Sequence, residues 1–435
     1  MDRALLHQLK RLAALFLGLG LFSTGFGLLM SVVALKLTGA GYNDLTTGLV
    51  NAAFYLGGII GSVYCARYIA GVGHIRTFAA FAALLAVFAL AHALFLSAWG
   101  WALLRLASGF LFYGLIMTVE SWLNQRATAH WRGRILSLYM VLYFLAYIMG
   151  QLLLNVRTHS NSTLFVISGM LIAVSLVPVA VMRADRPEPA DLRGFSLSGL
   201  LGLPLLATAG AFAGGLMEGA FFTLAPIYAA RIGLSTQHVS LLVTAGILGG
   251  LAFQWPLGLA SDFISRRGVI AAGSCLTAAP AFLLVLAPHW PFLARSVLVF
   301  ICGGGLFALY SLSLAHATDY ATAHTVADVN RNLLLANALG AVVAPAAGGA
   351  LMLALGAKGL FVLLACVSLS LLPCIPTART LPRRLRGVFV PIPQQTTYAA
   401  ARLDPRRDRD WTERGRAVRR KWLRRHGGRK RGTSR

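Results

Sequence analysis

Charged residues are scarce in this chain. Asp, Glu, Lys and Arg make up 12% of its 435 residues, which is about half of the share in an average soluble protein. This composition excludes an ordinary water-soluble domain, which covers its surface with charged groups. Hydrophobic residues make up 57%, and they recur in continuous runs long enough for a helix to cross a hydrocarbon core of about 30 Å. An outer-membrane barrel would need short alternating segments instead. The sequence therefore predicts a polytopic, all-helical membrane protein.

Signatures of catalysis and of metal binding are absent as well. The sequence contains no Walker loop, no nucleophile triad and no cluster with metal-ligand spacing. Its five cysteines lie in or beside apolar segments, without a CxxC pair, so we interpret them as small buried hydrophobic residues. They are Cys65, Cys275, Cys302, Cys366 and Cys374. We therefore expect neither enzymatic activity nor a bound metal or cofactor.

Acidic residues are few: 14 Asp and Glu stand against 39 Lys and Arg, for a net charge of +25. Residues 377–435 hold 19 of the basic residues and four of the acids. In this tail, Trp411, Val418 and Trp422 have the spacing of one helical stripe. Such a basic amphipathic helix suits the anionic lipids of the cytoplasmic leaflet, and a solvated disordered tail is the alternative. Nucleic-acid binding is not expected.

The basic residues of the short loops alternate in number along the chain. One set of loops carries fourteen Lys and Arg, whereas the opposite set carries five: Lys36, Arg157, Arg231, Arg295 and Lys358. Loops rich in Lys and Arg stay in the cytoplasm. We therefore predict that both termini are cytoplasmic and that the protein lies in the bacterial inner membrane with an even number of spans.

The two parts of the chain resemble each other at an offset of 192 residues. The matches include Gly27 with Gly219, Gly41 with Gly233, and Leu56–Gly58 with Leu248–Gly250. Six apolar segments lie on each side of a charged hinge, which predicts twelve transmembrane helices in two pseudo-symmetric halves. The predicted parts are a first half (1–182), a cytoplasmic hinge (183–202), a second half (203–376) and the basic tail (377–435). Parallel repeats of this kind place a substrate at their interface.

A loop motif follows the second apolar segment of the second half. Residues Gly258–Gly268 read G-L-A-S-D-F-I-S-R-R-G, which resembles the loop signature of the major facilitator superfamily. Asp262, Arg266 and Arg267 occupy its acidic and basic positions, and we predict that they form a conformational latch between helices. The alternative is that both arginines serve topology alone. In the first half, Ala70 stands where the motif has an acid.

Four shorter motifs resemble the YcaD-type bacterial branch of the same superfamily. They are E-S-W-L-N from Glu120, R-G-R from Arg132, G-Q-L-L-L from Gly150 and S-L-A-H-A-T-D from Ser313. The resemblance covers residues 10 to 376 and implies a monomeric secondary transporter that moves a small solute by alternating access, with protons as the coupling ion. A transporter-derived receptor or scaffold, which binds solute without moving it, is the alternative; uptake and efflux both stay open.

Five ionisable residues in or beside apolar segments are candidates for a site, because a charge there needs a partner or a function. They are Arg105, Glu120, Glu218, His316 and Asp319, and we predict that they bind substrate or protons. Arg105 and Glu120 are fifteen positions apart in one helix, or about 60° in azimuth, so both can face one cavity. A buried carboxylic acid generally has a raised pKa and can carry a proton. The alternative for Glu120, His316 and Asp319 is a hydrogen-bond network that ties helix ends together.

Overall fold

A computed structural model describes residues 3–126, 132–156, 162–182, 197–286, 290–321 and 325–378, together with Phe389 and Thr397. Every regular element in these ranges is helical, as the continuous apolar runs predict. The predicted hinge and the amphipathic stripe of the tail lie largely outside the described residues. The part of the hinge that is described, Leu197–Leu201, forms a short helix, α8.

The first half contains six spans. Its elements are α1 (Arg3–Gly39), α2 (Asp44–Val72), α3 (His74–Ala91), α4 (Ala98–Arg126), α5 (Arg132–Leu152) with the short η1 (Leu153–Asn155), and α6 (Ser162–Val174) continued by α7 (Leu176–Ala180).

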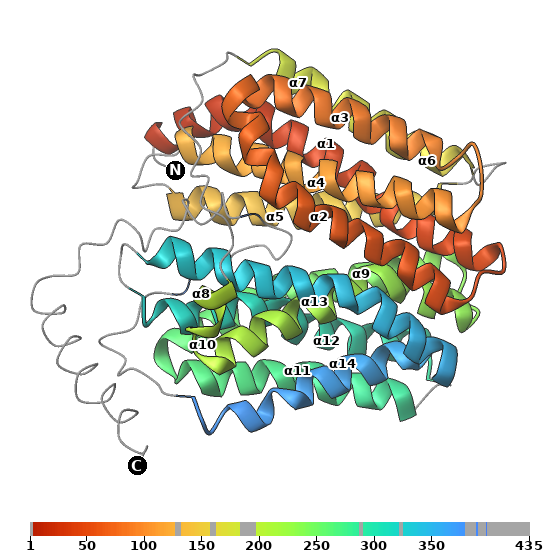
Figure 1. The fold of residues 1–435 in the computed structure, drawn as a ribbon. Helices are drawn as coiled ribbons and strands as arrows, with labels where there is room; N and C mark the ends of the chain where they lie inside the picture. Colours follow the sequence, from red (N-terminus) through yellow and green to blue (C-terminus); the bar gives the residue numbers. More distant parts are fainter. Residues whose placement is uncertain are drawn as a thin grey trace, which may run out of the picture.

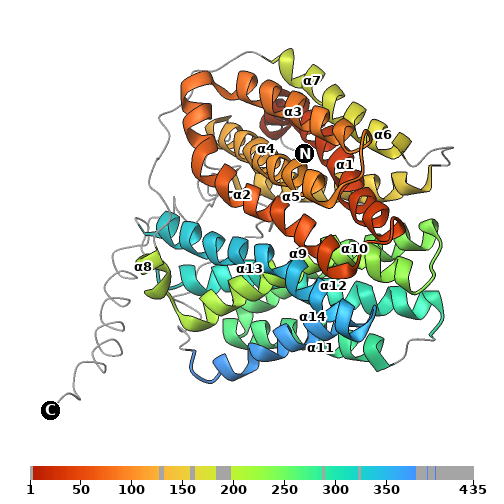
Figure 2. The ribbon, with the colours of Figure 1, turned by 45° about the vertical axis from the view of Figure 1, so that its right-hand side comes forward.

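The second half follows α8 and repeats this order. Its elements are α9 (Leu205–Arg231), α10 (Thr236–Phe263), α11 (Arg266–Leu286), α12 (Phe292–Thr318), α13 (Val326–Leu355) and α14 (Gly359–Ser370) with η2 (Leu372–Cys374). Figures 1 and 2 show α1–α7 on one side of the molecule and α8–α14 on the other. The predicted division into two six-helix halves is confirmed.

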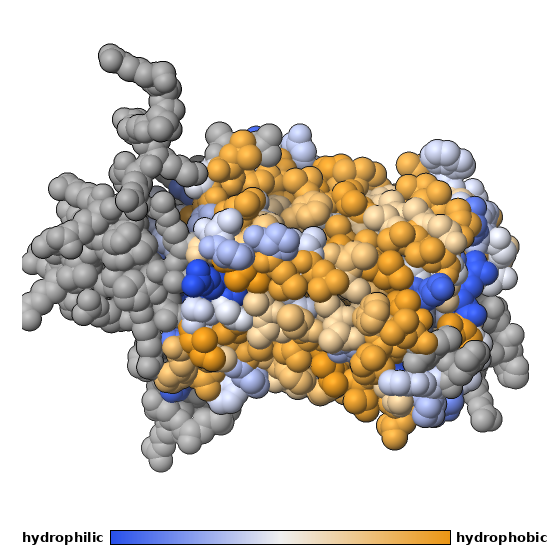
Figure 3. Space-filling model, turned by 90° about the horizontal axis from the view of Figure 1, so that it is seen from below, coloured by the Kyte–Doolittle hydropathy of each residue, from blue (hydrophilic) through white to orange (hydrophobic). Residues whose placement is uncertain are grey.

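The helices have the length and composition of membrane spans. In the described residues, 11 helices are long and apolar enough to cross a membrane, and the shorter apolar helix Gly359–Cys374 follows them. Large hydrophobic side chains such as Leu103, Met170 and Val177 are exposed on the outside of the bundle. Figure 3 shows hydrophobic residues covering the middle of one face and hydrophilic residues gathered toward its ends. This surface suits lipid around the bundle and water at its two ends.

The two halves, which are related in sequence by the offset of 192, also share the geometry at the start of equivalent helices. Gly41 and Gly233, which match in the sequence, both have a positive φ, at 86° and 77°. Two residues later, Asn43 caps α2 and Ser235 caps α10, and each side chain accepts a backbone N–H three residues on. A positive φ suits glycine because it has no Cβ. The offset of 192 therefore relates equivalent turns and caps.

Paired glycines also allow the same close helix contacts in both halves. A Cβ on Gly109 would collide with the carbonyl oxygen of Phe54, and a Cβ on Gly303 would collide with that of Gly246. Phe54 and Gly246 are themselves related by the offset of 192. These contacts join α2 to α4 and α10 to α12, and small residues permit such backbone approach in membrane helices.

The bundle has two ends, which we name after residues. The Asp44 end contains the start of α2 and the ends of α9 and α13; the Glu120 end contains the ends of α4, α10 and α12. In Figure 1, the start of α1 and the end of α14 lie at the same side, which is the Glu120 end. The prediction that this end is cytoplasmic rests on the loop charges.

Candidate functional site

Glu218 lies in the middle of α9, at the interface between the halves. It is buried, and it lies within electrostatic range of Tyr55, Tyr113, Tyr143 and Tyr147. These tyrosines come from α2, α4 and α5, so an acid of the second half is placed among phenol groups of the first half.

Aromatic rings also form contacts between the two halves. The ring centroids of Tyr147 and Phe222 are 4.7 Å apart, and those of Phe144 and Phe307 are 5.8 Å apart. Each pair joins α5 of the first half to α9 or α12 of the second. The interface between α5 and the second half is therefore aromatic.

Arg105 is a second buried charge, at the eighth of the 29 residues of α4. Its side chain is fully buried in α4. Its Cζ lies 4.7 Å from the ring centroid of Phe54, and its Nη2 donates to the thioether of Met30. Among the described residues, its Nε and Nη1 have no hydrogen-bond partner. A cation–π contact contributes about 2 kcal/mol when desolvated, whereas burying an ion costs several kcal/mol. The contacts that Arg105 makes therefore do not offset the free-energy cost of burying its charge.

Arg105 and Glu218 share neighbours, because Tyr55 and Tyr147 lie within electrostatic range of both. We call Arg105, Glu218, Tyr55, Tyr113 and Tyr147 the central cluster. Its two charged members are predicted from the sequence, and the tyrosines are not. The tyrosines are distributed over three helices, and no motif marks them.

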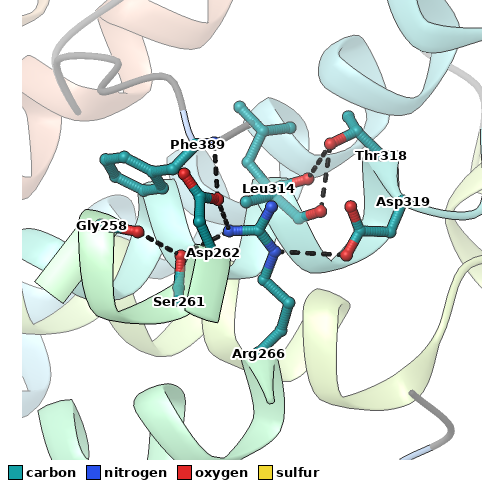
Figure 4. A network of polar contacts seen from close by, with 9 residues as sticks. Gly258, Ser261, Asp262, Arg266, Leu314, Thr318, Asp319 and Phe389 are labelled. Atoms are coloured by element: carbon teal, nitrogen blue, oxygen red, sulfur yellow. Dashed lines mark hydrogen bonds and ion pairs between the residues drawn. The ribbon is translucent and has the colours of Figure 1, made fainter. Parts of the chain in front are cut away.

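A second cluster surrounds Arg266 at the Glu120 end (Figure 4). The guanidinium of Arg266 is buried, with Nε 3.2 Å from Oδ2 of Asp319 and Nη1 3.0 Å from Oδ1 of Asp262; Nη1 also donates to the hydroxyl of Ser261. The backbone N–H of Phe389 donates to the same Asp262 oxygen at 2.9 Å. These ion pairs join the α10–α11 turn to the end of α12.

This cluster unites residues that the sequence analysis placed in different groups. Asp262 and Arg266 were predicted as a latch and Asp319 as a substrate or proton site, and all three form one network. Arg267 has no hydrogen bond or ion pair with these three among the described residues; its Nη1 donates to the carbonyl oxygen of Ala378 at 3.3 Å. His316 is buried nearby, with its ring edge-on to Tyr320 at 5.6 Å.

Glu120 belongs to a third cluster. The hydroxyl of Tyr139 donates to Oε1 of Glu120 at 3.1 Å. The backbone N–H of Thr397 donates to Oε2 of Glu120 at 2.9 Å, and the Thr397 hydroxyl donates to the same oxygen. Fifteen residues of helix separate Glu120 from Arg105, or about 22 Å along the axis. The two residues predicted to face one cavity therefore contact different groups, and Glu120 binds Thr397 of the tail.

The Asp44 end holds contacts between the halves that the sequence analysis did not predict. Asp44 of α2 forms an ion pair with Arg231 of α9 at 2.9 Å. Asn155 of η1 donates to the hydroxyl of Ser240 of α10, also at 2.9 Å. From the sequence, Arg231 is interpreted only as a basic loop residue that reports topology, because its partner Asp44 is 187 positions away in the chain.

Metal-ligating side chains are not grouped anywhere in the described ranges. No three His, Cys, Asp or Glu residues of these ranges approach one another as a metal site would require. The five cysteines carry free thiols, and Cys65 and Cys302 are buried. The chemistry of the described part of the chain is therefore that of buried ion pairs, phenols and carboxylates.

The comparison with protein families agrees with this fold. The sequence model of the Major Facilitator Superfamily matches residues 15–330 and 206–425. The chain belongs to the major facilitator superfamily. Within this superfamily it is 26% identical over 363 residues to YcaD of Salmonella heidelberg (strain SL476), an uncharacterised MFS-type transporter. The match covers 81% of this chain and 92% of that relative, which confirms the resemblance to the YcaD type.

Solved structures of this superfamily share the fold. The nucleoside transporter NupG is similar with a TM-score of 0.71, at 11% identity, covering 85% of this chain and 99% of the other. A bacterial homologue of the human lysosomal transporter Spinster, in an inward-facing and occupied conformation, gives 0.66 at 13% identity, covering 84% and 94%. The chain is therefore a multi-pass membrane protein with the fold of a transporter.

Proposed function

We propose that this protein is a secondary transporter that moves a small solute by alternating access at the interface of its two halves. The observation that carries this proposal is the central cluster. It brings two buried charges, Arg105 of the first half and Glu218 of the second, within electrostatic range of the same tyrosines, Tyr55 and Tyr147. Buried charge inside a membrane is costly and is typical of a substrate or ion pathway.

The contacts between the halves at the Asp44 end support one conformational state in this proposal. The halves are joined at the Asp44 end by Asp44 with Arg231 and by Asn155 with Ser240. In the predicted topology this end faces the periplasm, so we propose that these contacts close the protein on that side. Transport then requires these contacts to break while the Glu120 end closes.

We further propose that protons drive the cycle and that Glu218 carries them. Glu218 is a buried acid of the second half within electrostatic range of four tyrosines of the first half, Tyr55, Tyr113, Tyr143 and Tyr147. A phenol can donate a hydrogen bond to a carboxylate or accept one from a carboxylic acid. This environment therefore suits both protonation states of one acid.

In this proposal the protein works as a monomer in the bacterial inner membrane with both termini in the cytoplasm. The latch formed by Asp262 and Arg266 links α10, α11 and α12 and changes with the state of the second half. The basic tail binds anionic lipids of the cytoplasmic leaflet.

Flux through liposomes tests the proposal. A solute screen on the purified protein by thermal stabilisation selects ligands, and their flux is then measured with and without a pH gradient. Flux that depends on the protein supports transport, and accumulation that depends on the gradient supports proton coupling. A ligand that binds but never crosses would support the alternative, a receptor that does not transport.

A further inference from the structure

We infer that Arg105, with the hydroxyl groups of Tyr55 and Tyr147, forms the binding site for the carboxylate of an organic monoanion with an apolar body. This inference names the substrate class of the proposed transporter and rests on that function. It starts from a buried cation whose hydrogen-bonding groups are mostly unused.

The unused groups are donors. A guanidinium has five N–H bonds, and among the described residues only the thioether of Met30, a weak acceptor, receives one. The hydroxyl groups of Tyr55 and Tyr147 have no hydrogen-bond partner in the described ranges either. Ser108, one turn further on the same side of α4, presents another such hydroxyl. A set of donors around one positive charge fits an anionic oxygen ligand.

The number of positive charges limits the charge of the ligand. Among the described residues, the large side chains that are fully buried include two arginines, Arg105 and Arg266. Arg266 already pairs with Asp319 and Asp262, so Arg105 alone compensates the ligand. A second negative charge would have no cation and would also face Glu218. The site therefore fits a carboxylate better than a phosphate dianion.

The side chains beside Arg105 indicate the chemistry of the remaining part of the ligand. Phe54 lies against the guanidinium, and Phe26 stacks on Phe112 with ring centroids 3.9 Å apart. Tyr113 contacts both Phe54 and Phe112. These rings offer apolar surface beside the donors, which suits an aromatic or branched hydrocarbon body.

Matched acids and amides test this inference, because each pair differs in charge and hardly in shape. The probes are benzoate and benzamide, 3-phenylpropionate and 3-phenylpropionamide, and 4-methylpentanoate and its amide. Binding to the full-length protein in detergent is measured by titration calorimetry, and each variant is checked by thermal melting. We expect at least one acid to bind at least about thirty-fold more tightly than its amide. Equal affinity within every pair, or no binding by any acid, overturns the inference.

Variants assign the binding to the site. We expect Arg105→Gln to abolish acid binding and Arg105→Lys to weaken it at least about ten-fold, because lysine lacks the planar fork of arginine. Tyr55→Phe and Tyr147→Phe each remove one hydroxyl and should weaken binding about three- to ten-fold. Arg67→Gln, at an exposed arginine of α2, is the matched control and should bind normally. Should Arg105→Gln fail to fold, the two Tyr→Phe variants decide, and unchanged acid affinity in both overturns the site.

Flux measurements distinguish a failure of the anion site from a failure of the proposed transport function. Acid binding that depends on Arg105, without any flux in liposomes, supports the anion site and defeats transport. Flux of amides at the same rate as acids, unaffected by Arg105→Lys, defeats the anion site and leaves transport standing.

Discussion

A single methyl group added at Gly48 should open the Asp44 end. Gly48 lies in α2 where this helix crosses α13 of the other half. A Cβ at this position would lie 2.9 Å from the carbonyl carbon of Pro345 and closer still to its oxygen. Both are main-chain atoms and cannot rotate away, so the helices must separate. Overpacking of this kind costs about 1–3 kcal/mol, and it acts only on the state in which the halves touch here.

The expected result is a shift of the conformational equilibrium. With that cost, Gly48→Ala disfavours the state closed at the Asp44 end by about 5- to 150-fold. The measurement is the distribution of distances between spin labels at Ala40 and Gln237, which are exposed on opposite halves at this end. Gly20→Ala is the control, because a Cβ on Gly20 meets no atom within 4 Å. Identical distance distributions in the two variants would refute the claim that this contact closes the Asp44 end.

Three further predictions concern coupling, the latch and topology. Glu218→Gln, which keeps the shape of the protonated acid, should still exchange substrate across liposomes but lose accumulation driven by a pH gradient; full gradient-driven transport would remove Glu218 as the proton carrier. Asp262→Asn removes an ionic partner of the buried Arg266 and should lower the transport rate several-fold. Ala70→Asn, in the equivalent loop of the first half, should change the rate little. Equal rates in the two variants would show that the motif Gly258–Gly268 serves topology alone. Reporter fusions after residues 193 and 435 should be active only with a cytoplasmic reporter, and a periplasmic signal at either would contradict the predicted orientation.

The fold could be predicted in unusual detail from the sequence, because lipid restricts the choices. A span must satisfy its own backbone hydrogen bonds, so continuous apolar runs can only be helices. The internal offset of 192 then predicted equivalent turns, and Gly41 and Gly233 share a positive φ for the local reason that glycine tolerates it. These properties depend on residues close together in the chain.

The candidate site was predicted only in part. Arg105 and Glu218 were recognised because a charge in an apolar run stands out, whereas the tyrosines around them resemble ordinary core residues in sequence. Asp44 and Arg231 lie in loops or at helix ends, where charges are common, so their pairing left no signal. The tail residues that contact Glu120 and Asp262, Thr397 and Phe389, lie in a segment that carries no motif.

The sequence by itself determined the class of protein, the all-helical fold and the twofold repeat, since hydropathy and local backbone preference act over one or two turns of chain. Only the tertiary structure decided which buried groups meet. It paired Arg266 with Asp319 across 53 positions, joined the halves through Asp44 and Arg231, and separated Glu120 from Arg105. Such partners are chosen by how twelve helices pack, and the free energy of each contact depends on groups that are distant in the chain and adjacent only in the folded bundle.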